Sequence, residues 1–102
     1  MAEIKQLGID IELNDEVAQG HYSNLAIISH STSEFVVDFA AVLPGVQKAR
    51  VRSRIILTPE HAKRLLLSLQ DNISKYEANV GKIELSQRQG QPSASFHKLG
   101  EA

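Results

Sequence analysis

Residues 58–81, TPEHAKRLLLSLQDNISKYEANVG, decide the fold because they predict one long helix near the end of the chain. Thr58 is a favourable N-cap, and Pro59 stands at the first helical position, where its missing N–H is no loss. Gly81 suits the position just beyond the last turn. Apolar residues recur four and three positions apart and therefore share one face, which we call the helix seam: Ala62, Leu65, Leu66, Leu69, Ile73, Tyr76 and Val80.

The segment before this helix predicts antiparallel strands joined by short turns. Residues 21–57 hold three apolar stretches, and Pro44-Gly45 between the last two is typical of a type II turn. Residues 9–13 alternate between apolar and acidic side chains and predict a fourth, shorter strand. The helix and a ten-residue strand each span about 33 Å, so the helix can lie along the whole sheet. The fold class is therefore α+β: two layers, with the long C-terminal helix packed on an antiparallel sheet of about four strands.

Size and leftover apolar surface predict self-association. A chain of 102 residues makes one domain, which we divide into a leader with a short strand at 1–20, a single α+β domain at 21–85 and a disordered tail at 86–102. One helix covers only part of one sheet face, and a two-fold dimer is the commonest way to bury the rest. An alternative is that the leader and residues 82–85 fold back over it. We expect a dimer or higher homo-oligomer, with an oligomer surface of Leu65, Leu66, Leu69, Ile73 and Tyr76.

The charge of the chain is distributed unevenly. The net charge of −1 is the sum of −6 over residues 1–42, +5 over 46–64 and 0 over 65–102. Four cations at every second position are expected on one face of a strand, and we call them the basic row: Lys48, Arg50, Arg52 and Arg54. Three interpretations are open: a solvated face paired with acids of neighbouring strands such as Asp38 and Glu34 or with those of the leader, a contact surface for an acidic protein partner, or a contact for nucleic-acid phosphates. Nucleic acid is the least favoured, because the row lacks interleaved aromatic residues.

No residue pattern points to catalysis, a cofactor or a metal. The chain has no cysteine, its six glycines are scattered, and its four histidines do not pair at helical spacing: His21, His30, His61 and His97. A metal bound by both His21 and His30 would need a third ligand from elsewhere, such as Asp38 or Glu34. The serines beside His30 are better explained as turn residues. An arginine of the basic row is the expected structural partner of Asp38.

Targeting and membrane signals are also missing from the sequence. The N-terminus lacks a basic segment followed by an apolar one, and no apolar run exceeds five residues, far short of the ~20 that span a bilayer. We therefore expect a cytoplasmic protein without membrane contact.

Two groups of residues resemble a family of small prokaryotic proteins catalogued only as a domain of unknown function. The first is Tyr22-x-Asn24, Ile28-Ser29-His30-Ser31, Glu34-Phe35-Val36-Val37-Asp38-Phe39 and Pro44-Gly45. The second is Arg54-Ile55-Ile56-Leu57-Thr58-Pro59-Glu60-His61-Ala62-Lys63-Arg64-Leu65-Leu66 with Asn72 and Tyr76-Glu77. The resemblance covers about residues 20–85 and implies no assigned activity. Strands followed by a long C-terminal helix also look like the SecB-type export chaperone fold, in which protomers associate and expose apolar grooves for unfolded chains.

The sequence therefore predicts a non-enzymatic protein without cofactors: an oligomeric binding or assembly module of unknown process. A chaperone-like binder of peptides or proteins is one version of this prediction. The alternative is a nucleic-acid-associated regulator that uses the basic row, Lys48 to Arg54. The two differ in salt dependence, because binding to phosphates weakens steeply as salt is added.

Overall fold

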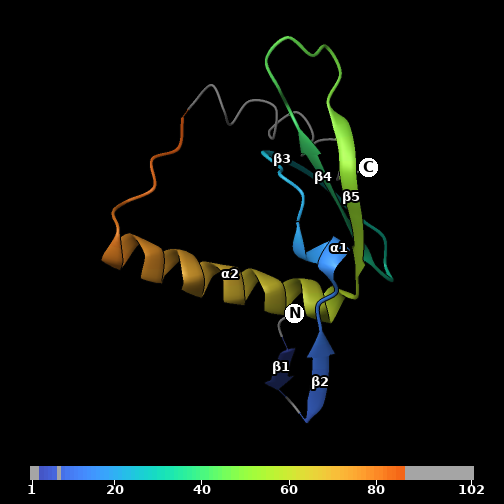
Figure 1. Cartoon of the computed structure of the whole chain (residues 1–102), viewed down its shortest axis with the longest axis vertical. Helices are drawn as coiled ribbons and strands as arrows, with labels where there is room; N and C mark the ends of the chain where they lie inside the picture. The colour runs from blue at the N-terminus through green and yellow to red at the C-terminus, as the bar shows by residue number, and fades with distance from the viewer. Residues whose placement is uncertain (1–2, 7, 87–102) are drawn as a thin grey trace.

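The computed structural model describes residues 3–6 and 8–86. Its elements are β1 (Glu3–Gln6), β2 (Ile9–Glu12), α1 (Asp15–Ala18), β3 (Leu25–His30), β4 (Phe35–Ala41), β5 (Arg50–Leu57) and α2 (Pro59–Asn79). Strands β3, β4 and β5 form an antiparallel sheet in that order, and α2 is one long C-terminal helix (Figure 1). The predicted α+β class is confirmed. Apart from Ser86, the predicted disordered tail at 86–102 lies outside the described residues.

The connection between β4 and β5 contains the predicted turn. The Val46 amide donates to the Leu43 carbonyl at 3.2 Å, and Gly45 between them has a φ of 78°. A type II turn requires a positive φ at this position, and proline suits the position before it. The turn predicted at Pro44-Gly45 is therefore confirmed.

Asn24 extends the pairing of β3 with β4 beyond the backbone ladder. Its Nδ2 donates to the Val42 carbonyl at 3.0 Å, and its Oδ1 accepts from the Val42 amide at 2.7 Å. The Asn24 amide itself donates to the Ala40 carbonyl at 3.1 Å. A side-chain amide carries both a donor and an acceptor, so it can imitate one residue of a strand pair. Asn24 thereby ties the entry of β3 to the exit of β4.

The register of the strands assigns the side chains to two faces of the sheet. Directly paired residues share a face, and neighbours along a strand alternate between faces. Val37 pairs with Ile28 on one side and Ile55 on the other, and we call their face the inner face. Asp38 pairs with Arg54 on the opposite, outer face. The centre of the inner face carries no charged residue: it consists of Ala26, Ile28, Val37, Phe39, Ser53 and Ile55.

The helix begins immediately after the sheet ends. Leu57 is the last residue of β5 and Pro59 the first of α2, so Thr58 alone connects them. Thr58 has φ −68° and ψ 153°, an extended conformation that the following proline favours. Its Oγ1 accepts a hydrogen bond from the His61 amide at 3.1 Å, which confirms the predicted N-cap.

The packing of the helix differs from the prediction of two packed layers. α2 contacts the sheet chiefly near the end of β5, and Figure 1 shows it running away from the strands. A chain must reverse direction to lie back on the strand that it leaves, and loops between strands and helices usually take about 2–6 residues. Thr58 is a single extended residue and does not supply such a reversal. The helix therefore projects from the sheet and does not lie along it.

The N-terminal segment adds a separate small sheet. β1 and β2 pair with each other in antiparallel fashion, with Ile4 opposite Ile11. The strand predicted at residues 9–13 is therefore present, but its neighbour is β1, and the main sheet has three strands where about four were expected. After β2, α1 begins with Asn14 as its N-cap, whose Oδ1 accepts from the Val17 amide at 2.9 Å.

The buried core of the described residues is small. All five buried apolar residues belong to the three-stranded sheet: Leu25, Val37, Ala40, Ala41 and Leu57. Among the residues with described side chains, none of the large ones is fully buried, and α2 contributes no buried residue at all. A single copy of the chain therefore leaves many large apolar side chains in contact with solvent.

Candidate interaction surface

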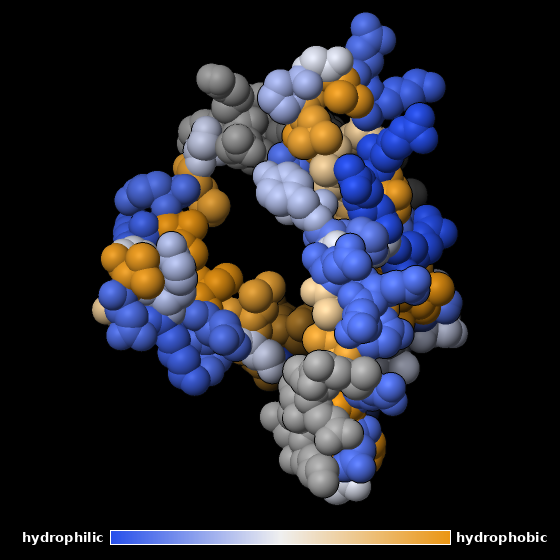
Figure 2. Space-filling view, in the orientation of Figure 1, coloured by the Kyte–Doolittle hydropathy of each residue, from blue (hydrophilic) through white to orange (hydrophobic). Residues whose placement is uncertain are grey.

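The helix seam is exposed along the whole of α2. Leu66 is 59% exposed, Leu69 55% and Tyr76 50%, and none of the 21 helix residues is buried. Figure 2 shows apolar side chains gathered on the side of α2 that faces a hollow between the helix and the sheet. Exposed apolar patches of this kind mark interaction surfaces in soluble proteins. All five residues of the predicted oligomer surface lie on this helix and are exposed: Leu65, Leu66, Leu69, Ile73 and Tyr76.

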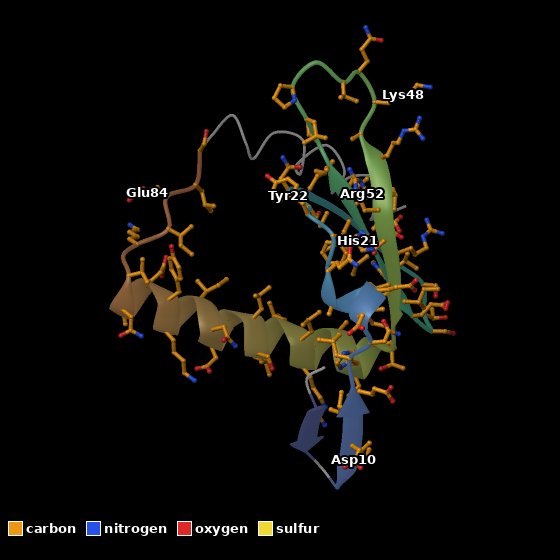
Figure 3. All side chains as sticks on the ribbon, viewed as in Figure 1. Asp10, His21, Tyr22, Lys48, Arg52 and Glu84 are labelled. Carbon is orange, nitrogen blue, oxygen red and sulfur yellow. The ribbon has the colours of Figure 1, made fainter. Side chains whose placement is uncertain are left out.

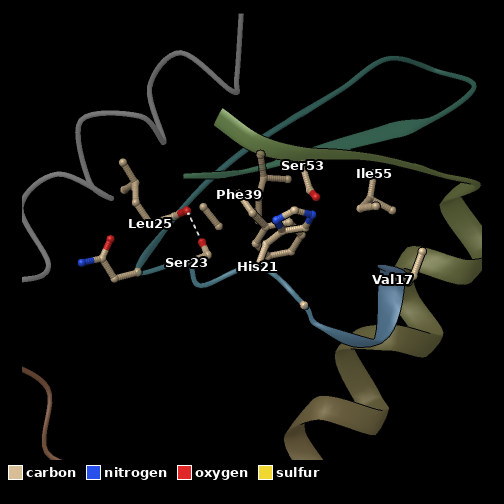
Figure 4. A pocket seen from close by; sticks show the side chains of 11 residues that line it. Val17, His21, Ser23, Leu25, Phe39, Ser53 and Ile55 are labelled. Carbon is tan, nitrogen blue, oxygen red and sulfur yellow. Dashed lines mark hydrogen bonds between the residues drawn. The ribbon is translucent and has the colours of Figure 1, made fainter. Parts of the chain in front are cut away.

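The inner face of the sheet forms the floor of a depression of about 960 Å³. Ile28 and Ile55 line it and are 51% and 44% exposed. Val17 of α1 and the segment that leads into β3 form a wall. Figure 4 shows His21 of that segment in front of Phe39. The floor is mainly apolar, so it favours contact with apolar side chains.

Ser23 belongs to the framework of this wall. Its Oγ donates to the Leu25 carbonyl at 3.0 Å (Figure 4) and to the Ala40 carbonyl at 2.9 Å. The hydroxyl therefore joins the entry of β3 to β4 and has its proton engaged. This contact and the Asn24 side chain connect the segment before β3 to the end of β4 and to Val42.

A β-bulge interrupts the basic row. Phe39 pairs with Ser53, but Ala40 pairs with Val51, so Arg52 is an extra residue in β5. An extra residue in one strand shifts the alternation of side chains beyond it by one position. The bulge therefore reverses which face the residues before Arg52 share.

The four cations of the row consequently do not share one face, which corrects the prediction. Arg54 lies opposite Asp38 on the outer face, whereas Arg50 lies opposite Ala41, three positions further along β4 and hence on the other face. Lys48 lies in the connection before β5, and all four side chains are exposed. Figure 3 shows Lys48 and Arg52 far from Asp10 of β2, so this acid of the leader does not pair with that end of β5 within one copy.

Arg54 is engaged in a bidentate ion pair with Asp38. Its Nε lies 2.7 Å from Oδ1 and its Nη2 2.9 Å from Oδ2. This hydrogen bonding lowers the pKa of Asp38 below its ordinary value and raises the pKa of Arg54. The expected structural partner of Asp38 is thereby confirmed. Lys48, Arg50 and Arg52 form no ion pair with a carboxylate in the described part of the chain, so the row offers three cations to a partner.

The histidines and serines near β3 serve local structure. The rings of His30 and Phe35 stack with their centres 5.2 Å apart. Ser31 Oγ accepts from the Ser33 amide at 3.1 Å, as expected for a turn residue. Within residues 3–6 and 8–86, no three His, Cys, Asp or Glu side chains come together in a way that could hold a metal ion. His97 lies outside the described residues.

The predicted site contains no residue of the inner face, which the structure leaves partly open: Ile28 and Ile55 are exposed, and the other central residues are half-buried or, at Val37, buried. The sequence did carry a signal for this. Only Thr58 separates the end of β5 from Pro59, and a connection this short keeps the helix off the sheet. No helix in the described part of the chain has the length and apolarity needed to cross a membrane.

Comparison with known proteins identifies the family but no activity. Residues 1–85 match the family described as "Protein of unknown function (DUF3467)". The match covers most of the chain, so the chain belongs to this family, and the expected resemblance to a domain of unknown function is confirmed. No curated protein and no solved structure matches the chain. The likeness to the SecB-type fold therefore stays a prediction.

Proposed function

We propose that this member of the family is a non-enzymatic assembly and binding module that works as a homodimer or higher oligomer in the cytoplasm of a prokaryotic cell. The observation that carries the proposal is the helix seam. It runs the length of α2, its large apolar members are 39% to 69% exposed, and no residue of α2 is buried. Burying such a stripe against a partner is the cheapest way to remove it from water.

The free energy available from the seam is comparable with the cost of association. Full burial of one large apolar side chain contributes about 1.5–3 kcal/mol. The five residues of the oligomer surface are 39–59% exposed, so burial of this exposed fraction contributes roughly 4–7 kcal/mol per helix. Two helices together contribute about 8–14 kcal/mol, against an association cost of about 4–15 kcal/mol. The seam supports a dimer, and further apolar surface strengthens it.

The proposed partner of the assembled protein is an extended peptide or protein segment with acidic residues. β5 is an edge strand, so one row of its backbone N–H and C=O groups has no neighbouring strand in the sheet. Lys48, Arg50 and Arg52 place positive charge along this edge and have no carboxylate partner among the described residues. An extended segment can add to such an edge as a further strand. A chaperone-like hold on unfolded chains is one form of this binding.

We propose a non-enzymatic role because the polar side chains near the sheet are engaged in structural hydrogen bonds. Ser23 donates to backbone carbonyls, Ser31 accepts from a turn amide, and Asp38 is held by Arg54. A nucleophile or general base must be free to reach a substrate. These groups hold the strands and turns of the sheet together instead.

Two measurements on the intact chain test the proposal. Sedimentation equilibrium gives the mass in solution, and fluorescence anisotropy of a labelled acidic peptide gives binding. We expect a dimer or larger particle whose peptide binding is lost in the Arg50→Glu/Arg52→Glu double variant. The matched control is Lys63→Glu/Lys82→Glu, which changes the net charge equally at exposed positions outside β5 and should leave binding unchanged.

Three results would contradict the proposal. The first is a monomer at every concentration, and the second is equal loss of peptide binding in the control. The third is binding of duplex DNA in place of the peptide, with the logarithm of affinity falling by about 0.9 per contacted phosphate for each logarithmic unit of salt. That last result would favour the nucleic-acid-associated regulator.

A further inference from the structure

We propose that in the assembled protein the helix seam of a second copy lies on the inner face of the sheet, so that two copies exchange their α2 helices. This inference rests on the self-association proposed above and names the surface that receives the helix. It concerns residues that the predicted oligomer surface did not include.

Each copy carries two apolar surfaces that it cannot bring together by itself. Thr58 is the only residue between β5 and α2, and its extended conformation directs the helix away from the strands. The seam and the inner face consequently stay apart, with Leu69 55% exposed on one and Ile28 51% exposed on the other. Figure 2 shows that the hollow between them is open to solvent. A second copy supplies the missing surface to each.

The two surfaces match in length and in chemistry. The 21 residues of α2 extend about 31 Å, and the eight residues of β5 about 27 Å. The centre of the inner face has no charged residue, whereas the outer face holds the Asp38–Arg54 ion pair. An apolar helix stripe would have to desolvate that pair on the outer face, which is costly. The inner face is therefore the side on which the seam packs.

The area of the exchanged contact reaches the lower end of the range that stable interfaces bury, about 1,200–2,000 Å² over both partners. A helix footprint of about 31 Å by 10 Å and a sheet footprint of about 27 Å by 10 Å give each copy roughly 600 Å² of flat contact. Side chains that protrude from these surfaces add to the accessible area that is buried. A stable interface buries about 800 Å² of accessible surface per partner. Pairing of the two helices alone would use only about half of this footprint. Exchange is also reciprocal, so a two-fold axis closes the assembly at two copies.

Thiol cross-linking tests the contact directly, because the chain has no cysteine of its own. One population carries Leu69→Cys and a second, of different mass, carries Ile28→Cys. After mixing and mild oxidation, we expect a cross-link between the two populations. Ala78→Cys, on the opposite face of α2, is the matched control and should not cross-link to Ile28→Cys.

The outcomes separate this inference from the proposed function. A dimer in which Leu69→Cys cross-links only to itself overturns the exchange but leaves self-association through the seam. A protein that is monomeric by sedimentation overturns both. Cross-linking of Ala78→Cys as strongly as Leu69→Cys would show non-specific collision and overturn the exchange.

Lengthening the connection provides a second, independent test. Four residues, Gly-Ser-Gly-Ser, inserted between Leu57 and Thr58 give the chain room to reverse, so α2 can lie on its own inner face. A short connection favours exchange between copies, and a longer one removes the need for it. We expect the dimer to convert to a monomer. The same insertion between Val46 and Gln47, in the exposed β4–β5 connection, should leave the dimer intact; an unchanged dimer in both variants contradicts the exchange.

Discussion

Truncating two leucines of the helix seam should dissociate the protein without damaging one copy. Leu66 and Leu69 lie one turn apart on α2, and neither is buried in a single copy. Replacement of both by alanine keeps or slightly raises the helix propensity. Any loss of mass in solution would therefore come from the contact between copies and not from a weakened helix.

The size of the effect follows from the exposed fraction of each side chain. Truncation of leucine to alanine removes about three methylene equivalents, or about 2.4 kcal/mol of transfer free energy. Leu66 is 59% and Leu69 55% exposed, so about 1.4 and 1.3 kcal/mol of this belong to assembly. A two-fold dimer contains each substitution twice, which gives about 5.4 kcal/mol. The dissociation constant should rise by about four orders of magnitude.

Sedimentation equilibrium over a wide concentration range measures this constant, and the helix offers its own control. Leu67 is 57% exposed but stands on the opposite side of α2 from the seam. Leu67→Ala removes the same atoms and should change the dissociation constant by less than tenfold. The reasoning is refuted if the double variant dimerises as tightly as the wild type, or if Leu67→Ala weakens the dimer as much per residue.

Three further predictions concern the folded chain. Arg54 lowers the pKa of Asp38, so the ion pair stabilises the fold above the unfolded pKa of about 3.9, and this stabilisation is lost as pH falls through the folded pKa. In urea titrations, the difference in unfolding free energy between the wild type and Asp38→Asn should be constant above pH ~5 and should shrink below pH ~4. An equal difference at low pH would refute the assignment. Asn24→Ala loses two hydrogen bonds to Val42 and should lower the free energy of unfolding by about 1–3 kcal/mol in the same assay, whereas a change below about 0.5 kcal/mol would contradict a stabilising role for these bonds. Thr58→Ala removes the N-cap of α2 and should cost about 1 kcal/mol in thermal unfolding, with Thr58→Ser restoring most of it.

The elements that the sequence predicted best are those that depend on neighbouring residues. The helix over 59–79 follows from Thr58, Pro59 and a regular apolar spacing, all of which act within a few residues of each other. The turn at Pro44-Gly45 likewise needs only its own backbone angles. The ion pair of Asp38 was predictable because consecutive strands joined by the turn at Pro44-Gly45 pair in antiparallel fashion, which places the arginines of β5 beside the single acid of β4.

The bulge and the position of the helix depend on contacts between strands, which a local pattern does not encode. Residues 48–54 alternate perfectly in sequence, and the alternation breaks only where Ala40 pairs with Val51 and leaves Arg52 extra. The helix was placed on the sheet because the two lengths agree. Equal lengths of helix and strand allow the two to pack along each other, but the single connecting residue Thr58 determines the direction in which the helix leaves the sheet.

The small core links folding of this chain to its assembly. Isolated helices are marginal in water, and most helix stability in proteins comes from packing of an apolar face. α2 buries none of its residues in one copy, and the five buried apolar residues of the described chain all lie in the sheet. The two-stranded β1–β2 sheet is also too small to be stable by itself. In the proposed dimer a second copy covers the seam and adds to the stability of each chain, so we expect the free energy of unfolding to rise with protein concentration.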